Sequence, residues 1–262
     1  LNSVINGRKD GAMIIAEEST AWPKVTHSPE DGGLGFTFKW NMGWMHDFLE
    51  YMKLDPYFRK FNHGKMTFSL MYAYSENFIL VLSHDEVVHL KCSMLGKMPG
   101  DREDKFANLK LAYAYMCGHP GKKLLFMGQE FGQWNEWSEK RALDWYLLED
   151  DSHKELKDFT KACLILNKKY RCLYETDYSP EGFRWINAND KDNSVFSFIR
   201  ISPDKKRHLL FVFNFTPVER PNHRIGVPVK GKYKLVLGDD MKNQKKTLTR
   251  VRGECDGYKE SL

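Results

Sequence analysis

Continuous apolar runs that end in polar residues constrain the fold of this chain more than any other feature of its sequence. Four such runs, the second of them weaker, occupy residues 12–16, 35–40, 78–82 and 123–127. Buried parallel strands are typically continuous apolar runs, whereas half-exposed strands alternate. Three of the runs lead into polar residues, at Glu17, Ser83 and Gln129. The pattern therefore predicts a parallel sheet with polar side chains along its carboxyl edge.

Helical patterns occupy the stretches between and after these runs, at residues 44–52, 65–74, 104–117 and 154–169. Alternating strands and helices indicate an α/β fold with a parallel sheet. A (β/α) barrel and an open doubly wound sheet both place their sites at the carboxyl edge, so the pattern does not choose between them. No Gly-rich phosphate loop follows any of the runs.

The pattern changes in the last third of the chain, where no long helical pattern occurs. Short β-rich runs at residues 183–186, 194–201, 208–215 and 233–237 are separated by turn sequences. We therefore expect two units: an α/β unit at residues 1–172 and a small antiparallel β domain at residues 173–262.

The composition excludes several other classes of protein. The chain has 262 residues, of which 42% are hydrophobic and 29% charged, and no apolar run approaches the roughly 20 residues of a membrane span. The net charge of +5 is mild, and the basic stretch at 242–252 is typical of a solvated face, so we expect no nucleic-acid partner. Five cysteines without close pairs or metal spacing indicate a reduced, cytoplasmic protein with no metal or other cofactor.

The aromatic content is high, at 14% with seven tryptophans. Exposed rings near carboxylates suggest sugar binding, because a ring face packs against the apolar face of a pyranose. Trp40 and Trp44 follow the second run, and Trp134 and Trp137 follow the fourth. We expect Trp44 to be a core residue, and at least one ring of the second pair to be exposed because its segment is otherwise polar.

Carboxylates after the first and third runs are the candidates for chemistry. Glu17 fits a general acid at a strand end, but it equally fits an acid at the beginning of a helix. Asp85 and His84 fit groups that hold sugar hydroxyls, or a simple strand-to-helix turn. A zinc site at His84 and His89 matches no strong ligand spacing. The residues alone leave these alternatives open.

Six segments in chain order carry a resemblance to a known family. They are Ile14-Ile15-Ala16-Glu17-Glu18-Ser19-Thr20, Trp40-Asn41-Met42-Gly43-Trp44-Met45-His46-Asp47, Leu82-Ser83-His84-Asp85-Glu86-Val87-Val88-His89, Lys122-Lys123-Leu124-Leu125-Phe126-Met127-Gly128-Gln129-Glu130-Phe131, Leu143-Asp144-Trp145 and Asn214-Phe215-Thr216-Pro217-Val218. Together they resemble the bacterial glycogen (1,4-α-glucan) branching enzymes of the α-amylase superfamily, over nearly the whole chain.

The resemblance implies strands five to eight of a TIM (β/α)8 barrel, followed by a C-terminal antiparallel β-sandwich. It also implies a retaining double displacement on an α-glucan, with an aspartate nucleophile on strand four. Glu17 would be the general acid/base and Asp85 the transition-state stabiliser. His84, Trp40, Asn41 and Trp134 would contact the substrate. We expect Glu17 and Asp85 to project from neighbouring strand ends into one shared sugar pocket.

The chain also departs from the family pattern. The nucleophile motif Gly-Phe-Arg-x-Asp-Ala is absent, and the similar stretch at 182–188 has no carboxylate in the required place. The chain begins at Leu1 without an initiator Met, ends before the last strand usual in the family, and has Leu90 where Gly is common. We therefore expect a fragment that is inactive alone and whose partner is the missing amino-terminal half. The alternatives are an α-1,4-glucan hydrolase and a non-catalytic glucan-binding protein.

Overall fold

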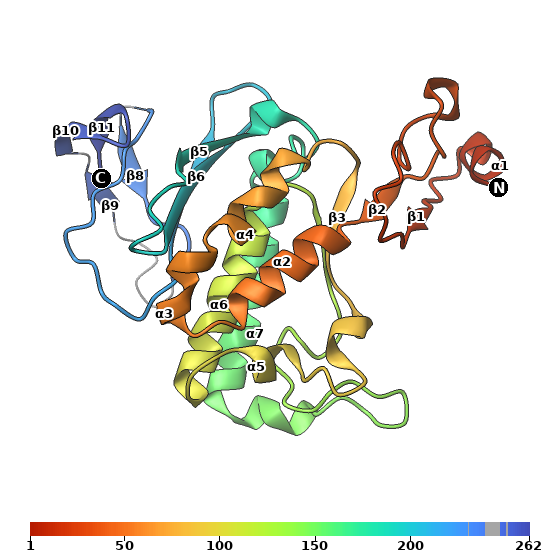
Figure 1. The fold of residues 1–262 in the computed structure, drawn as a ribbon, viewed down its shortest axis with the longest axis horizontal. Coiled ribbons are helices and arrows are strands. Elements are labelled where there is room, and N and C mark those ends of the chain that lie inside the picture. Colours follow the sequence, from red (N-terminus) through yellow and green to blue (C-terminus); the bar gives the residue numbers. More distant parts are fainter. Residues whose placement is uncertain (230, 239–246, 250) are drawn as a thin grey trace.

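The computed structural model describes residues 1–229, 231–238, 247–249 and 251–262. The helices are α1 (Asn2–Arg8), α2 (Met42–Met52), α3 (Pro56–Arg59), α4 (Gly64–Thr67), α5 (Met94–Lys97), α6 (Arg102–Gly118) and α7 (Asp151–Lys169). The strands are β1 (Ile15–Ala16), β2 (Phe38–Trp40), β3 (Phe78–Leu82), β4 (Lys122–Leu125), β5 (Phe183–Asn187), β6 (Val195–Ile201), β7 (His208–Asn214), β8 (Lys232–Lys234), β9 (Thr247–Thr249), β10 (Val251–Cys255) and β11 (Tyr258–Ser261). In Figure 1 the longer helices lie between β1–β3 and the β5–β6 sheet.

The four strands of the first half form one parallel sheet in the order β1-β2-β3-β4. The spatial order follows the chain order, without the reversal that makes a doubly wound sheet. A (β/α) barrel winds in this way, so the topology favours the barrel over the open sheet. All five residues of β3 are buried, as its continuous apolar sequence predicts.

Several predicted elements differ from those observed. The run at 12–16 gives only two residues of strand, with Met13 64% and Ile15 44% exposed, because β1 is an edge strand whose outer side has no neighbour in the sheet. The helix predicted at 65–74 is instead the short helix α4 followed by a 3-10 turn, Phe68–Met71. Long helices were better predicted: α6 and α7 lie within three residues of expectation.

Helices α2 and α6 share an aromatic core with the antiparallel sheet. The ring of Tyr115 on α6 lies 6.1 Å from that of Phe48 on α2 and 5.3 Å from that of Phe213 on β7. The Tyr115 hydroxyl donates to the carbonyl of Met66, so its buried polar atom is satisfied. The core is therefore continuous from the helices into the β region.

The C-terminal region is β-rich, as predicted, although its arrangement is only partly that of a sandwich. Strands β5, β6 and β7 form an antiparallel three-stranded sheet, while β8–β9 and β10–β11 form two separate antiparallel pairs. The strand predicted at 233–237 is observed as β8, shifted toward its amino end. Much of the basic stretch at 242–252 lies outside the described residues.

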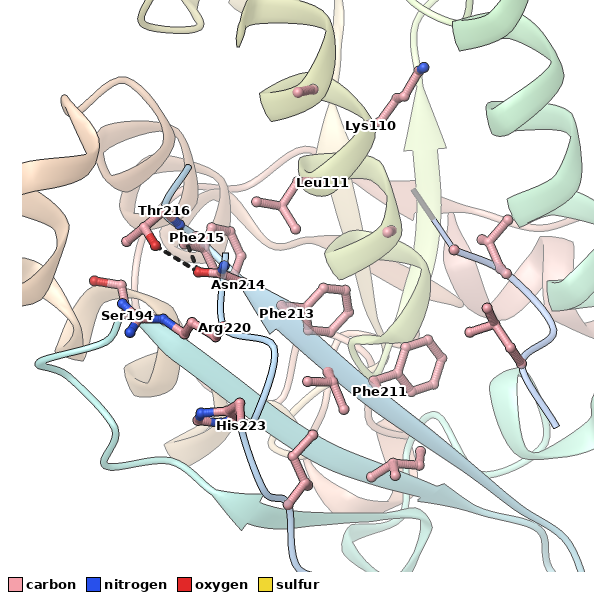
Figure 2. A pocket seen from close by; sticks show the side chains of 18 of the residues that line it. Lys110, Leu111, Ser194, Phe211, Phe213, Asn214, Phe215, Thr216, Arg220 and His223 are labelled. Atoms are coloured by element: carbon pink, nitrogen blue, oxygen red, sulfur yellow. Dashed lines mark hydrogen bonds between the residues drawn. The ribbon is translucent and has the colours of Figure 1, made fainter. Parts of the chain in front are cut away.

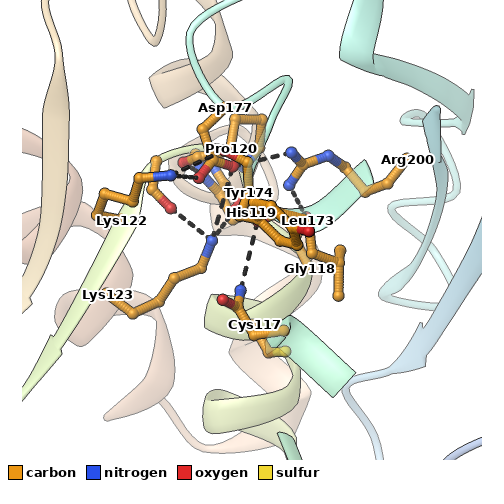
Figure 3. Close-up of polar contacts among 12 residues, drawn as sticks. Cys117, Gly118, His119, Pro120, Lys122, Lys123, Leu173, Tyr174, Asp177 and Arg200 are labelled. Carbon is orange, nitrogen blue, oxygen red and sulfur yellow. Dashed lines mark hydrogen bonds and ion pairs between the residues drawn. The ribbon is translucent and has the colours of Figure 1, made fainter. Parts of the chain in front are cut away.

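A buried ionic cluster joins the β region to the amino end of the parallel sheet (Figure 3). Asp177 lies 2.9 Å from the guanidinium of Arg200 on β6 and 3.0 Å from the ammonium of Lys122 on β4. The side chains of Asp177 and Arg200 are 1% and 0% exposed. Arg200 also donates to the carbonyls of Gly182 and Gly118, so each of its three guanidinium nitrogens makes a hydrogen bond.

Candidate functional site

The polar residues singled out from the sequence gather at the carboxyl edge of the parallel sheet. Glu17 follows β1, Trp40 ends β2, and His84 and Asp85 follow β3. Because all four strands are parallel, these carboxyl ends meet along one edge. Strand β2 separates β1 from β3, so Glu17 and Asp85 stand on alternate strands and the expectation of neighbouring strands was wrong.

Glu17 is exposed, and the residues around it are held by a lysine from the next strand. Lys39 on β2 is paired in register with Ala16, and its ammonium donates to Glu18 at 2.7 Å and to the carbonyl of Thr20 at 2.9 Å. The Lys39 hydrogen bond, with those from Thr20, lowers the pKa of Glu18 to about 2. Of two consecutive glutamates, Glu18 is therefore held in an ion pair, whereas the exposed side chain of Glu17 has no ion pair or hydrogen bond among the described residues.

The turn after β3 carries two carboxylates: Glu86 is buried in hydrogen bonds, and Asp85 is exposed. Ser83 and Glu86 form a capping box, in which buried Glu86 accepts from the Ser83 amide at 2.6 Å and from its hydroxyl at 2.8 Å. The side chains of His84 and Asp85 are instead 46% and 42% exposed and lie 3.2 Å apart. The turn thus has the strand-to-turn geometry of the simpler interpretation while presenting Asp85 and His84 to solvent.

The residues after β2 are more buried than a sugar platform requires. Trp40 is half-buried and packs against the main core, and Trp44 is 2% exposed, as expected. Asn41 is 2% exposed, and its side-chain oxygen accepts from the Trp44 amide at 2.9 Å, which caps α2. Its amide nitrogen has no hydrogen-bond partner among the described residues.

The two tryptophans after β4 occupy different places. Trp134 is 37% exposed, but its ring lies 6.2 Å from those of Phe106 and His153, near the first turns of α6 and α7. Trp137 is linked to the turn after β3, because its amide donates to the carbonyl of Val87 at 3.0 Å. Its ring also lies 5.2 Å from that of Phe126, which in turn lies 5.9 Å from the ring of His84. The contacts therefore add Trp137 as a site candidate, whereas only Trp134 of this pair was predicted from the sequence to contact the substrate.

A large cavity among the described residues lies elsewhere (Figure 2). It has a volume of about 2090 Å³ and is lined by α6, β7 and the segment around Tyr233, and not by Glu17, His84 or Asp85. A second cavity beside Val87 and Trp137 measures about 10 Å³, room for one water molecule. The candidate site is an open edge, and neither of these cavities is the shared pocket expected between Glu17 and Asp85.

In the described part of the chain, no three His, Cys, Asp or Glu side chains are placed to hold a metal ion together. No helix among the described residues has the length and hydropathy needed to cross a membrane.

Comparison with known proteins gives consistent results. The model of the alpha-amylase C-terminal all-beta domain matches residues 185–262. A 1,4-alpha-glucan branching enzyme of Butyrivibrio fibrisolvens is 56% identical over 99% of this chain and 42% of its own length. The corresponding proteins of Synechococcus sp. (strain JA-3-3Ab) and Halothermothrix orenii are 54% and 52% identical over 92% of this chain. The chain thus spans only 31% to 42% of the length of these relatives.

Solved structures support the fold alone. A pullulanase type I from Bacillus subtilis superposes with a TM-score of 0.66 at 14% identity, over 95% of this chain and 39% of the pullulanase. A cyclomaltodextrinase superposes with a TM-score of 0.60 at 20% identity, over 88% of this chain and 36% of its own. The chain is thus similar in sequence to part of the bacterial 1,4-α-glucan branching enzymes, and its residues 185–262 match the alpha-amylase C-terminal all-beta domain.

Proposed function

We propose that the chain is the carboxyl-terminal portion of a 1,4-α-glucan branching enzyme, which transfers a cleaved α-1,4 chain to a 6-hydroxyl of glycogen. One observation carries the proposal: Glu17, His84 and Asp85 are exposed at one edge of the parallel sheet. The chain that forms this sheet is 56% identical to a 1,4-alpha-glucan branching enzyme. In this proposal β1–β4 correspond to barrel strands five to eight. The units remain residues 1–172 and 173–262, and the protein is cytoplasmic, with its five cysteines free.

The proposed chemistry divides between this chain and a second segment. Glu17 protonates the glycosidic oxygen as its bond to C1 breaks, and the sugar passes to an aspartate that these 262 residues do not supply in the family motif. Glu17 then takes the proton of the acceptor 6-hydroxyl, whose oxygen bonds to C1 as the ester bond between C1 and the aspartate breaks. Asp85 accepts hydrogen bonds from sugar hydroxyls and stabilises the positive charge that develops at C1. His84, oriented by Asp85, contacts the same hydroxyls.

Branching assays test the division of labour. The purified chain, incubated with amylose, should form no new α-1,6 linkages. Adding the amino-terminal remainder of the Butyrivibrio fibrisolvens relative, expressed separately, should restore branching. Glu17→Gln should abolish the restored activity, whereas the exposed control Glu30→Gln should not. Clear branching by the chain alone would refute the incomplete-enzyme proposal.

Two alternative functions can be distinguished from branching by the products that the reconstituted protein forms and by glycogen binding. A hydrolase of the same superfamily would release short maltooligosaccharides from the reconstituted protein without forming branches. A non-catalytic glucan-binding protein would be retarded in a glycogen-containing native gel, and Trp134→Ala would abolish the retardation, while reconstitution produced no activity. Branches accompanied by Asp85-dependent retardation would favour the branching enzyme over both.

A further inference from the structure

The loop after the candidate turn has an unusual backbone. Three non-glycine residues within four positions, His89, Leu90 and Cys92, have left-handed φ values of 55°, 66° and 64°. Residues with a Cβ avoid this region because the Cβ approaches the following carbonyl oxygen. A cluster of such residues persists only where contacts from outside the segment hold it. Residues 88–92, called the strap below, therefore require an external support.

Glu136, from the loop after β4, provides that support. Its carboxylate accepts the backbone N–H of Leu90 at 3.0 Å and that of Cys92 at 2.7 Å. These hydrogen bonds, that of Cys92 foremost, hold the pKa of Glu136 below its ordinary value, so the acceptor stays charged. Lys97 also fixes the strap, because its ammonium donates hydrogen bonds to the carbonyls of Lys91 and Cys92.

The strap carries one highly exposed aliphatic side chain close in sequence to the candidate site. Leu90 is 96% exposed and lies five residues after Asp85, itself 42% exposed. A single exposed leucine is ordinary, but one on a left-handed backbone pinned by a charged group is not. We propose that Glu136 is a positioning residue, which holds the strap so that Leu90 contacts the apolar face of a glucose unit bound at Asp85.

This inference rests on the proposed glucan-binding function, but the clamp itself is testable without it. Glu136→Gln keeps the shape and replaces one acceptor oxygen with an N–H₂ donor that faces a backbone N–H. Hydrogen exchange of the Leu90 and Cys92 amides, followed by NMR in the full chain, should accelerate by about tenfold or more, as loss of charge-assisted hydrogen bonds implies. Glu139→Gln is the matched control, since Glu139 is exposed and has no polar partner within the described residues.

Binding of maltoheptaose tests the contact. Leu90→Asn keeps a residue that tolerates the left-handed conformation but removes the apolar surface. It should leave amide exchange unchanged and weaken maltoheptaose binding at least fivefold, while Leu90→Met should bind within twofold of the unsubstituted chain. Glu136→Gln should weaken binding through the displaced strap.

The outcomes separate the two levels of the proposal. Unchanged exchange of both amides in Glu136→Gln would overturn the clamp. Unchanged affinity in Leu90→Asn would overturn the contact. If the unsubstituted chain binds no maltoheptaose, the glucan contact fails together with the proposed binding function, whereas accelerated exchange in Glu136→Gln would still support the clamp.

Discussion

The ion pairs at the two ends of the parallel sheet differ in their exposure to solvent. At the carboxyl edge, Asp85 pairs with His84 at 3.2 Å, and both side chains are more than two-fifths exposed. At the amino end, Asp177 and Arg200 pair at 2.9 Å and are essentially inaccessible. An exposed ion pair contributes little to stability, whereas a buried charge requires full compensation. Charge therefore remains available for binding at one end and is used to attach the β region at the other.

The buried end is organised by more than one ion pair. Burial would raise the pKa of Asp177, yet the charges of Lys123 and Arg200 outweigh it and keep that pKa low. His119, at the end of α6, receives the Ser69 hydroxyl at one ring nitrogen and donates from the other to the carbonyl of Pro120. Asp177, Arg200 and both ring nitrogens of His119 all have partners, which makes this end sensitive to the loss of any one of them.

Removal of the Asp177 charge should have the largest effect. Asp177→Asn leaves Arg200 buried beside a neutral amide, and breaking a buried pair typically costs about 3–5 kcal/mol. Urea denaturation should show a loss of that order in the free energy of unfolding. Asp158→Asn, at an exposed position on α7, should change it by less than about 0.5 kcal/mol. Equal effects of the two substitutions would contradict the assigned role of the cluster.

Mild acid should weaken the buried end next. Burial lowers the pKa of His119 to about 3, and it also lowers that of His63. Below pH 6.5 these histidines are therefore protonated in the unfolded chain but stay neutral in the folded chain. The free energy of unfolding consequently falls as the pH drops from 6.5 toward 3. Between pH 7 and pH 5 we expect a loss of about 2 kcal/mol from His119 alone. Urea midpoints that do not change over this interval would show that the buried histidine is not held neutral.

At the exposed edge, Leu90→Gly should increase stability. Glycine adopts a φ of 66° without the Cβ clash, which removes about 1–2 kcal/mol of strain, while its greater freedom in the unfolded chain offsets roughly half of that. The net gain should be about 0.5–1 kcal/mol in thermal or urea unfolding. Leu90→Ala keeps the clash and should give no gain. A glycine variant no more stable than the alanine variant would mean that the strap is not strained.

The sequence predicted the exposed edge better than the buried end, for a physical reason. An apolar strand followed by polar residues is a local signal, so Glu17 and Asp85 could be placed at strand ends from the sequence alone. The pairing of Asp177 with Arg200 joins residues from different elements and depends on packing. The role of Lys39 was not predicted for a similar reason, because its partner lies on another segment of the chain. In the sequence it is an ordinary polar residue within a strand, whereas in the structure it is 5% exposed and donates a hydrogen bond to Glu18.

The fold shows the same division between local and long-range information. The long buried strand β3 and the capped helices α6 and α7 were predicted because pattern and capping residues agree. The two-residue strand β1 was overestimated, since an apolar run does not reveal that its outer edge has no neighbour. Short elements such as α4 depend on packing rather than on a repeated pattern.

The smallest effect on stability should come from Asp85, and it is the one that gives the comparison its functional meaning. Because the His84–Asp85 pair is exposed, Asp85→Asn should change the free energy of unfolding by less than about 0.5 kcal/mol. The same variant should lose most of its retardation in a glycogen-containing native gel, since an amide is a weaker acceptor for sugar hydroxyls than a carboxylate. A loss of stability as large as that of Asp177→Asn would mean that the Asp85 charge stabilises the fold. The carboxyl edge would then differ from the amino end in the exposure of its charges, but charges at both ends would stabilise the fold.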